Sequence, residues 1–167
     1  MTTGDIVVVL LVGGVIVLYI VNSKRRENVE RYLFGEILRD IAVAENKLAV
    51  SDRVAVAKHV LEQMTAEDNL VGDNKRNKKK VIEASRTIAE QAKADRHRPV
   101  AAGAWTFNDP DWCAASLVEV WATARWYADE KRISAVAFNM IDKAVWSFIS
   151  RTLSEVVPVA CAKIPLR

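Results

Sequence analysis

An uncharged and almost wholly apolar run near the N-terminus limits what this chain can fold into more than any other feature. The run from Ile6 to Val21 reads IVVVLLVGGVIVLYIV, with Gly13-Gly14 between its two halves. Two apolar runs joined by Gly-Gly are typical of a β-hairpin. However, a hairpin that buries one face alternates apolar and polar residues, and this run does not alternate. A lone hairpin is also marginal in water, and the chain offers no convincing third strand.

A single transmembrane helix explains the same run better. Residues 6–23 are just long enough, since a helix needs at least about 17 residues to cross a bilayer. In lipid a helix pairs all its backbone groups internally, so the low helix propensity of Val and Ile matters little. A cleaved signal peptide would start with basic residues and end at small ones, and neither flank fits. We therefore predict an uncleaved anchor at 6–23, with residues 1–5 as a short extracytoplasmic N-terminus.

The flanking charges predict the orientation of this anchor. Lys24, Arg25 and Arg26 follow the run, whereas only Asp5 precedes it. The positive-inside rule then places the N-terminus outside and the larger C-terminal part in the cytoplasm. The two cysteines, Cys113 and Cys161, agree with a reducing compartment, where free thiols are at least as expected as one disulfide.

The rest of the chain has the periodicity of helices. Residues 24–50 predict an amphipathic stalk helix, because apolar side chains recur there at spacings of three and four: Val29, Leu33, Ile37, Ile41, Ala44 and Leu48. Residues 51–167 predict a helical cytoplasmic domain with an irregular loop at 96–111.

Within that domain, helices are expected from Ser51 or Asp52, from about Lys75 to Asp95, from Pro110 to about Glu130, and from Ile133 towards Pro158. A new helical turn is also expected at Thr65, and a turn at Gly72-Asp73-Asn74. The predicted fold is therefore all-α, with one N-terminal transmembrane helix and a cytoplasmic bundle of four or five helices.

The densest charge cluster is a candidate phosphate contact, formed by Lys75, Arg76, Lys78, Lys79 and Lys80. A solvated first turn of a helix explains the cluster without any ligand, and we prefer that interpretation. Among ligands, anionic lipid headgroups are expected before nucleic acid. The formal net charge of +3 is mild, and a membrane surface accounts for it as readily as nucleic acid does.

Large aromatic residues mark a candidate partner surface. Trp105, Phe107 and Trp112 flank a proline-bounded loop, where large rings either pack inward or meet a partner. Two further pairs stand four residues apart, Trp121 with Arg125 and Trp126 with Glu130. They fit an aromatic groove with a cation–π partner, but core packing at helical spacing is the favoured interpretation.

The sequence lacks the usual signatures of catalysis or of metal and cofactor binding. His59 has Glu62 nearby but no convincing set of further ligands, so an ordinary, partly exposed histidine is expected. Ser116 and Ser150 lie outside any G-x-S-x-G pattern, and no phosphate-binding glycine motif or H-E-x-x-H occurs. We therefore predict no enzyme activity, no cofactor and no metal.

These features favour a single-pass, membrane-anchored helical protein for interaction or assembly. It would dock a protein partner, or another copy of itself, at the cytoplasmic face of the bilayer. The alternative is a membrane-associated binder of nucleic acid or anionic phospholipid that uses the basic cluster at 75–80.

Overall fold

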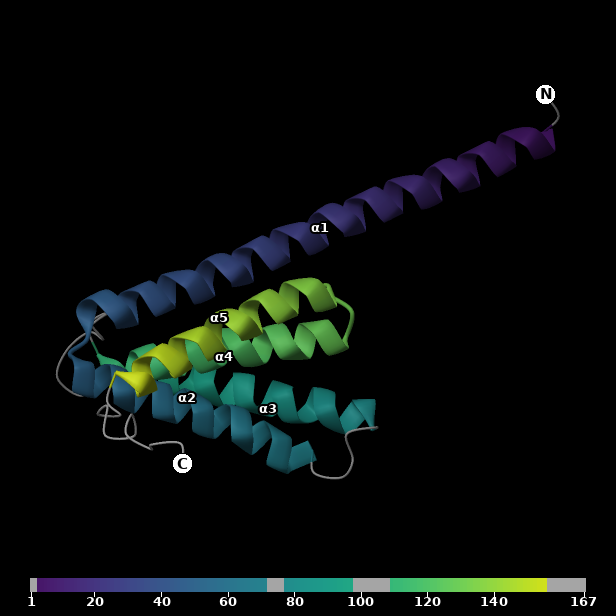
Figure 1. The fold of residues 1–167 in the computed structure, drawn as a ribbon. Coiled ribbons are helices and arrows are strands. Elements are labelled where there is room, and N and C mark those ends of the chain that lie inside the picture. Colours follow the sequence, from purple (N-terminus) through teal and green to yellow (C-terminus); the bar gives the residue numbers. More distant parts are fainter. Residues whose placement is uncertain (1–2, 72–76, 98–108, 156–167) are drawn as a thin grey trace, which may run out of the picture.

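The computed structural model of the chain folds into α-helices, in the order α1 (Thr3–Lys47), α2 (Val50–Val71), α3 (Lys78–Arg96), α4 (Pro110–Asp129) and α5 (Ala135–Ser154). It describes the backbone of residues 3–71, 77–97 and 109–155, and the side chains of residues 17–67, 77–97 and 109–155. No strand occurs in these ranges, so the all-α prediction is confirmed. Consecutive helices run in opposite directions, which brings the end of α2, the start of α3 and the α4–α5 turn to the same end of the bundle (Figure 1).

The first helix, α1, runs without interruption through Gly13-Gly14 and through Gly35. A helix of 45 residues is about 68 Å long at a rise of 1.5 Å per residue. Its N-terminal half projects away from the bundle (Figure 1). The side chains of residues 1–16, which include most of the predicted span 6–23, lie outside the described residues. Among the described residues, no helix combines the length and the apolar character needed to cross a membrane.

The last apolar turn of the projecting half is exposed on all its sides. The five residues from Val17 to Val21 are between 47 and 75 % exposed. Five consecutive residues cover more than one complete helical turn, so no face of this turn packs against the bundle. The turn therefore presents a ring of apolar side chains that no described part of the chain covers.

The C-terminal half of α1 packs into the bundle. Of the predicted apolar stripe, the residues from Leu33 to Leu48 are buried and Val29 is partly buried, and the stripe faces α4 and α5. Glu30 also links α1 to the start of α5, because its carboxylate accepts a hydrogen bond of 2.6 Å from the backbone N–H of Ser134. The segment 24–50, for which the sequence predicts a stalk, therefore also supplies one side of the bundle.

The ends of α2 and α3 differ from the sequence prediction in detail. The predicted helix start at Thr65 is wrong, because α2 continues through it. The Thr65 hydroxyl donates to the carbonyl of Leu61 at 2.8 Å, a bond that serine and threonine form inside helices. In α3 the cap is Asn77, whose side chain accepts from the N–H of Lys80 at 3.4 Å. The predicted turn at 72–74 lies outside the described residues.

The start of α4 follows from local sequence chemistry. Asp109 caps the helix, accepting from the N–H groups of Asp111 and Trp112 at 2.9 and 3.2 Å. Pro110 occupies the first helical position, as predicted, where its missing N–H is not needed. Of the predicted loop at 96–111, residues 98–108 lie outside the described part of the chain.

One main hydrophobic core joins all the helices, with Phe148, Ile37 and Leu117 fully buried. Side-chain hydrogen bonds also join neighbouring helices. Ser116 Oγ donates to Asp40 at 2.5 Å, Ser85 Oγ donates to Glu67 at 2.7 Å, and Trp121 Nε1 donates to Asp142 at 3.0 Å. Because buried polar groups are costly when unpaired, these bonds favour one register of the helices over others.

Candidate functional site

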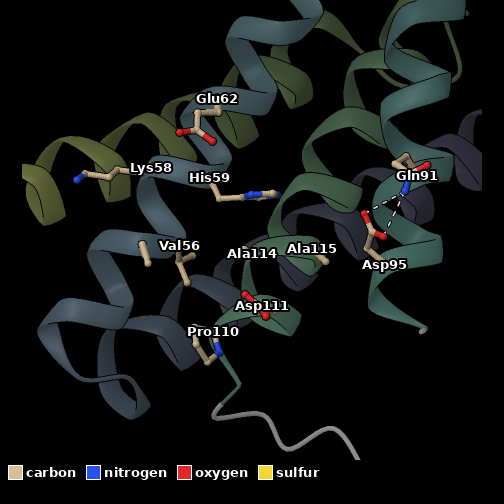
Figure 2. Close-up of a pocket in the computed structure, with 11 residues that line it drawn as sticks. Val56, Lys58, His59, Glu62, Gln91, Asp95, Pro110, Asp111, Ala114 and Ala115 are labelled. Atoms are coloured by element: carbon tan, nitrogen blue, oxygen red, sulfur yellow. Dashed lines mark hydrogen bonds between the residues drawn. The ribbon is translucent and has the colours of Figure 1, made fainter. Parts of the chain in front are cut away.

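A groove of about 720 Å³ lies between α2, α3 and the first turns of α4. These segments meet at the end of the bundle opposite to the projecting half of α1 (Figure 1). Figure 2 shows His59 pointing from α2 into the groove, with Gln91 and Asp95 on α3 across from it. The lining of α4 includes Ala114 and Ala115, and these small side chains leave the space between the helices unfilled.

The groove carries an excess of carboxylates. Glu62, Asp95 and Asp111 line it from three different helices. Gln91 Nε2 donates to both oxygens of Asp95 at 3.2 Å, which holds that carboxylate in place. Lys58 belongs to the lining, but its side chain points away from the other residues (Figure 2). This arrangement suits the ammonium or guanidinium group of a lysine or arginine.

The described residues of the groove do not form a metal site. Across these ranges, no group of three or more His, Cys, Asp or Glu side chains is placed to hold a metal ion. His59 is exposed on α2, and Ser150 is exposed on α5. Ser116 is fully buried and donates to Asp40, so its hydroxyl contributes to packing between α1 and α4.

Cys113 is a buried free thiol in α4. Burial, together with the charges of Asp40 and Asp109, raises the pKa of this thiol from 9.0 to about 11. Thiolate is the reactive form of cysteine, so this side chain is chemically inert near neutral pH. Cys161 lies outside the described residues.

We expect Cys113 to react with a thiol reagent at neutral pH only when the protein is unfolded. The folded state holds the thiol proton more tightly than the unfolded state does. Stability should therefore fall as pH rises from about 9 to about 11, whereas below pH 9 this group adds no pH dependence. Mass spectrometry of the labelled Cys161→Ser variant, with and without denaturant, checks the first expectation. Rapid labelling of the folded variant would contradict the buried position.

The predicted membrane-flanking residues lie where α1 leaves the bundle. Lys24, Arg25 and Arg26 are exposed, between the exposed apolar turn and the first residues of α1 that pack. Arg26 Nε lies 3.2 Å from the carboxylate of Glu30. Arg25 forms no ion pair with any described residue.

Part of the predicted phosphate cluster lies at the end of the bundle from which α1 projects, as the membrane-flanking residues do. Lys78, Lys79 and Lys80 are exposed in the first turn of α3, which starts at the end of the bundle from which α1 projects (Figure 1). Lys75 and Arg76 lie outside the described residues. Two further cations at this end, Lys131 and Arg132 in the α4–α5 turn, were missed, because a pair of basic residues in a turn does not stand out in the sequence.

Of the candidate partner surface, only Trp112 falls in the described chain. It is 9 % exposed, and the Arg96 guanidinium carbon lies 5.1 Å from the centre of its ring. The ring therefore packs inward and does not form an open surface. Trp105 and Phe107 lie outside the described residues.

The two tryptophans of the i, i+4 pairs have different surroundings. Trp121 is 3 % exposed and belongs to the core. Trp126 is half-buried. The two arginines that lie over its ring are not four residues away on the same helix. The guanidinium carbons of Arg86 and Arg132 lie 5.4 and 6.0 Å from its ring centre.

Sequence reasoning also missed Asp40, although a signal for it was present. Asp40 is fully buried, and it stands three residues after Ile37 and directly before Ile41. A carboxylate inside an apolar stripe indicates a buried partner, and Ser116 supplies one.

Comparison with known proteins finds no relative of this chain. The chain matches no protein family, and neither curated proteins nor solved structures include a significant match.

Proposed function

We propose that this protein is a single-pass, membrane-anchored helical module that docks a protein partner at the cytoplasmic face of a bilayer. One observation carries the proposal: α1 is a single helix with one half buried in the bundle and an exposed apolar turn in the other half. A helix that is apolar on every side needs apolar surroundings. A bilayer provides them, and the buried half of α1 holds the bundle close to it.

The dimensions and charges of α1 agree with this role. Residues 6–23 extend for about 27 Å as a helix, close to the hydrocarbon thickness of about 30 Å. Lys24, Arg25 and Arg26 follow directly, which favours a cytoplasmic bundle. The exposed Lys78, Lys79 and Lys80 lie at the same end of the bundle, where an anionic membrane surface attracts them.

The acidic groove is the proposed docking site. It lies at the end of the bundle away from the projecting half of α1, so an anchored bundle holds it clear of the membrane. Its three carboxylates favour a protein segment that carries lysine or arginine. A second copy of this chain is the other candidate partner, with one of its own basic segments in the groove.

Site-specific labelling tests the anchor and its orientation. In a Cys161→Ser background, the variants Thr2→Cys and Lys143→Cys provide one thiol before α1 and one exposed on α5, while Cys113 stays buried. In intact cells, an impermeant maleimide is expected to label Thr2→Cys only. The protein should also resist alkaline extraction from membranes. Extraction into the soluble fraction, or labelling of Lys143→Cys from outside, would refute the proposal.

Carbodiimide cross-linking in native membranes tests the docking groove, because the reagent joins carboxylates to lysines in direct contact. We expect partner cross-links at Glu62, Asp95 and Asp111. Glu27 and Glu83, exposed elsewhere on α1 and α3, serve as controls. The Glu62→Gln/Asp111→Asn variant should lose most of the cross-linked product. Cross-links spread equally over the control positions would contradict a specific groove, and links between two copies would identify the partner as the chain itself.

The second candidate function is phosphate binding through the cluster at 75–80. The exposure of Lys78, Lys79 and Lys80 at one helix start favours it, since basic residues there oppose the helix dipole and gain from an anion. Replacing all three by glutamine should abolish salt-sensitive binding to nucleic acid or anionic vesicles. Unchanged binding would eliminate this function.

A further inference from the structure

We propose that the groove between α1 and the α4–α5 turn binds the headgroup of an anionic glycerophospholipid. This inference rests on the proposed membrane anchor. The groove has a volume of about 510 Å³, and its lining brings together four cations from two distant parts of the sequence: Arg25, Arg26, Lys131 and Arg132. Tyr19 and Ser23 line the same groove and add hydroxyl groups suited to a phosphate or glycerol oxygen.

The α4–α5 turn is built to hold its two cations in fixed positions. The N–H of Lys131 donates to Ala128 at 3.0 Å, and the N–H of Arg132 donates to Tyr127 at 2.7 Å. This pair of bonds is the Schellman motif that ends many helices. The guanidinium carbon of Arg132 lies 3.7 Å from the ring centre of Tyr127, which restrains that side chain further.

Lys131 occupies a position that suits glycine better. Its φ of 61° is in the left-handed region, and it is the one positive φ among the non-glycine residues of the described chain. Glycine is the usual residue at this point of a Schellman motif because it lacks a Cβ. A lysine at this position makes the folded state less stable than a glycine would. The position also places its ammonium group at the groove, where it can bind an anion.

A polar contact fixes the α4–α5 turn beside α1. The carboxylate of Glu30 accepts from the backbone N–H of Ser134 at 2.6 Å and from Arg26 Nε at 3.2 Å. Glu130 lies 3.6 Å from Arg132. These two carboxylates offset part of the charge of Arg26 and Arg132. Arg25 and Lys131 form no ion pair with any described residue, so an excess of positive charge stays available to a ligand.

The position of the groove along α1 matches the depth of lipid headgroups. Arg25 follows Val21, the last residue of the apolar run, by four residues, or about 6 Å of helix. The polar layer on each side of a bilayer is of the same order, about 5–8 Å thick. A lipid whose acyl chains lie against the exposed turn at Val17–Val21 therefore has its phosphate beside the four cations.

Lipid selectivity of the full chain tests this site. The protein is reconstituted into phosphatidylcholine vesicles that contain a trace of phosphatidylglycerol or phosphatidylcholine labelled on an acyl chain. Energy transfer from the protein's tryptophans then reports which lipid is enriched beside it. Wild type is expected to favour phosphatidylglycerol. Arg25→Gln and Lys131→Gly should each reduce this preference about fivefold, the equivalent of about 1 kcal/mol per basic residue at a membrane surface.

Lys131→Gly keeps the fold intact, because glycine suits the left-handed position; its unfolding midpoint should equal or exceed that of wild type. Lys143→Gln, which removes an exposed lysine from α5, is the control for charge and should leave the preference unchanged.

Three results would overturn the inference. The first is a protein that inserts into the vesicles without preferring the anionic lipid. The second is a loss of preference in Lys143→Gln equal to that in Lys131→Gly. The third is competition by inorganic phosphate beyond that of chloride at equal ionic strength, which would assign the groove to free phosphate. Failure of the wild-type chain to resist alkaline extraction would instead refute the membrane anchor itself.

Discussion

Replacing Ile37 by alanine is expected to lower the free energy of unfolding by about 2–5 kcal/mol. Ile37 lies on α1 and is 0 % exposed, in the core that α1 shares with α4 and α5. The substitution removes apolar contacts and leaves a cavity that rigid neighbouring helices fill only in part. Chemical denaturation followed by circular dichroism, with the full chain in mild detergent, measures the effect.

Leu38→Ala is the matched control for this experiment. Leu38 is the next residue on the same helix and is 45 % exposed, so its truncation should change stability by only about 0.5 kcal/mol. The pair separates packing of α1 from its helix propensity, because alanine favours the helix at both positions. Equal effects at the two positions would mean that α1 does not pack against the bundle.

Replacing Asp40 by alanine is expected to cost about 2–4 kcal/mol, because it leaves a buried hydroxyl unpaired and opens a small cavity. The Asp40 carboxylate is fully buried, and it accepts from Ser116 Oγ at 2.5 Å. It also accepts from Arg39 Nη2 at 2.8 Å and from Arg39 Nε at 3.0 Å. Arg39 is half-exposed and can turn to water, so most of the loss should come from Ser116.

A double-mutant cycle isolates the bond between α1 and α4. Ser116→Ala alone should cost about 1–3 kcal/mol, because one buried carboxylate oxygen loses its donor. The Asp40→Ala/Ser116→Ala protein should then lose less than the sum of the single variants, with a coupling of about 1 kcal/mol. Strictly additive losses would show that the bond does not contribute in solution.

The periodicity of the sequence was sufficient to predict the helices and several of their ends. The stripe from Leu33 to Leu48 is buried as expected. The start of α4 follows from Asp109 and Pro110, which act through local capping geometry alone. Thr65 was misread as a helix start, since a threonine can bond backward to a carbonyl as readily as it can cap.

The candidate sites could not be predicted in the same way, because their residues come from distant segments. The acidic groove combines Glu62, Asp95 and Asp111, each from a different helix. The groove between α1 and the α4–α5 turn combines Arg25 with Lys131, which are separated by more than half of the sequence. Neither set forms a motif in the sequence, and neither exists until the helices have packed.

Local interactions therefore explain what the sequence alone revealed: an all-α chain, an apolar run before three basic residues, and amphipathic helices with recognisable ends. These properties depend on residues within one or two helical turns. Packing decided the rest. It placed the C-terminal half of α1 in the core and left the apolar turn at 17–21 exposed. It also brought Lys131 and Arg132 beside Arg25, because the antiparallel order of the helices places the α4–α5 turn at the end of the bundle where α1 leaves it.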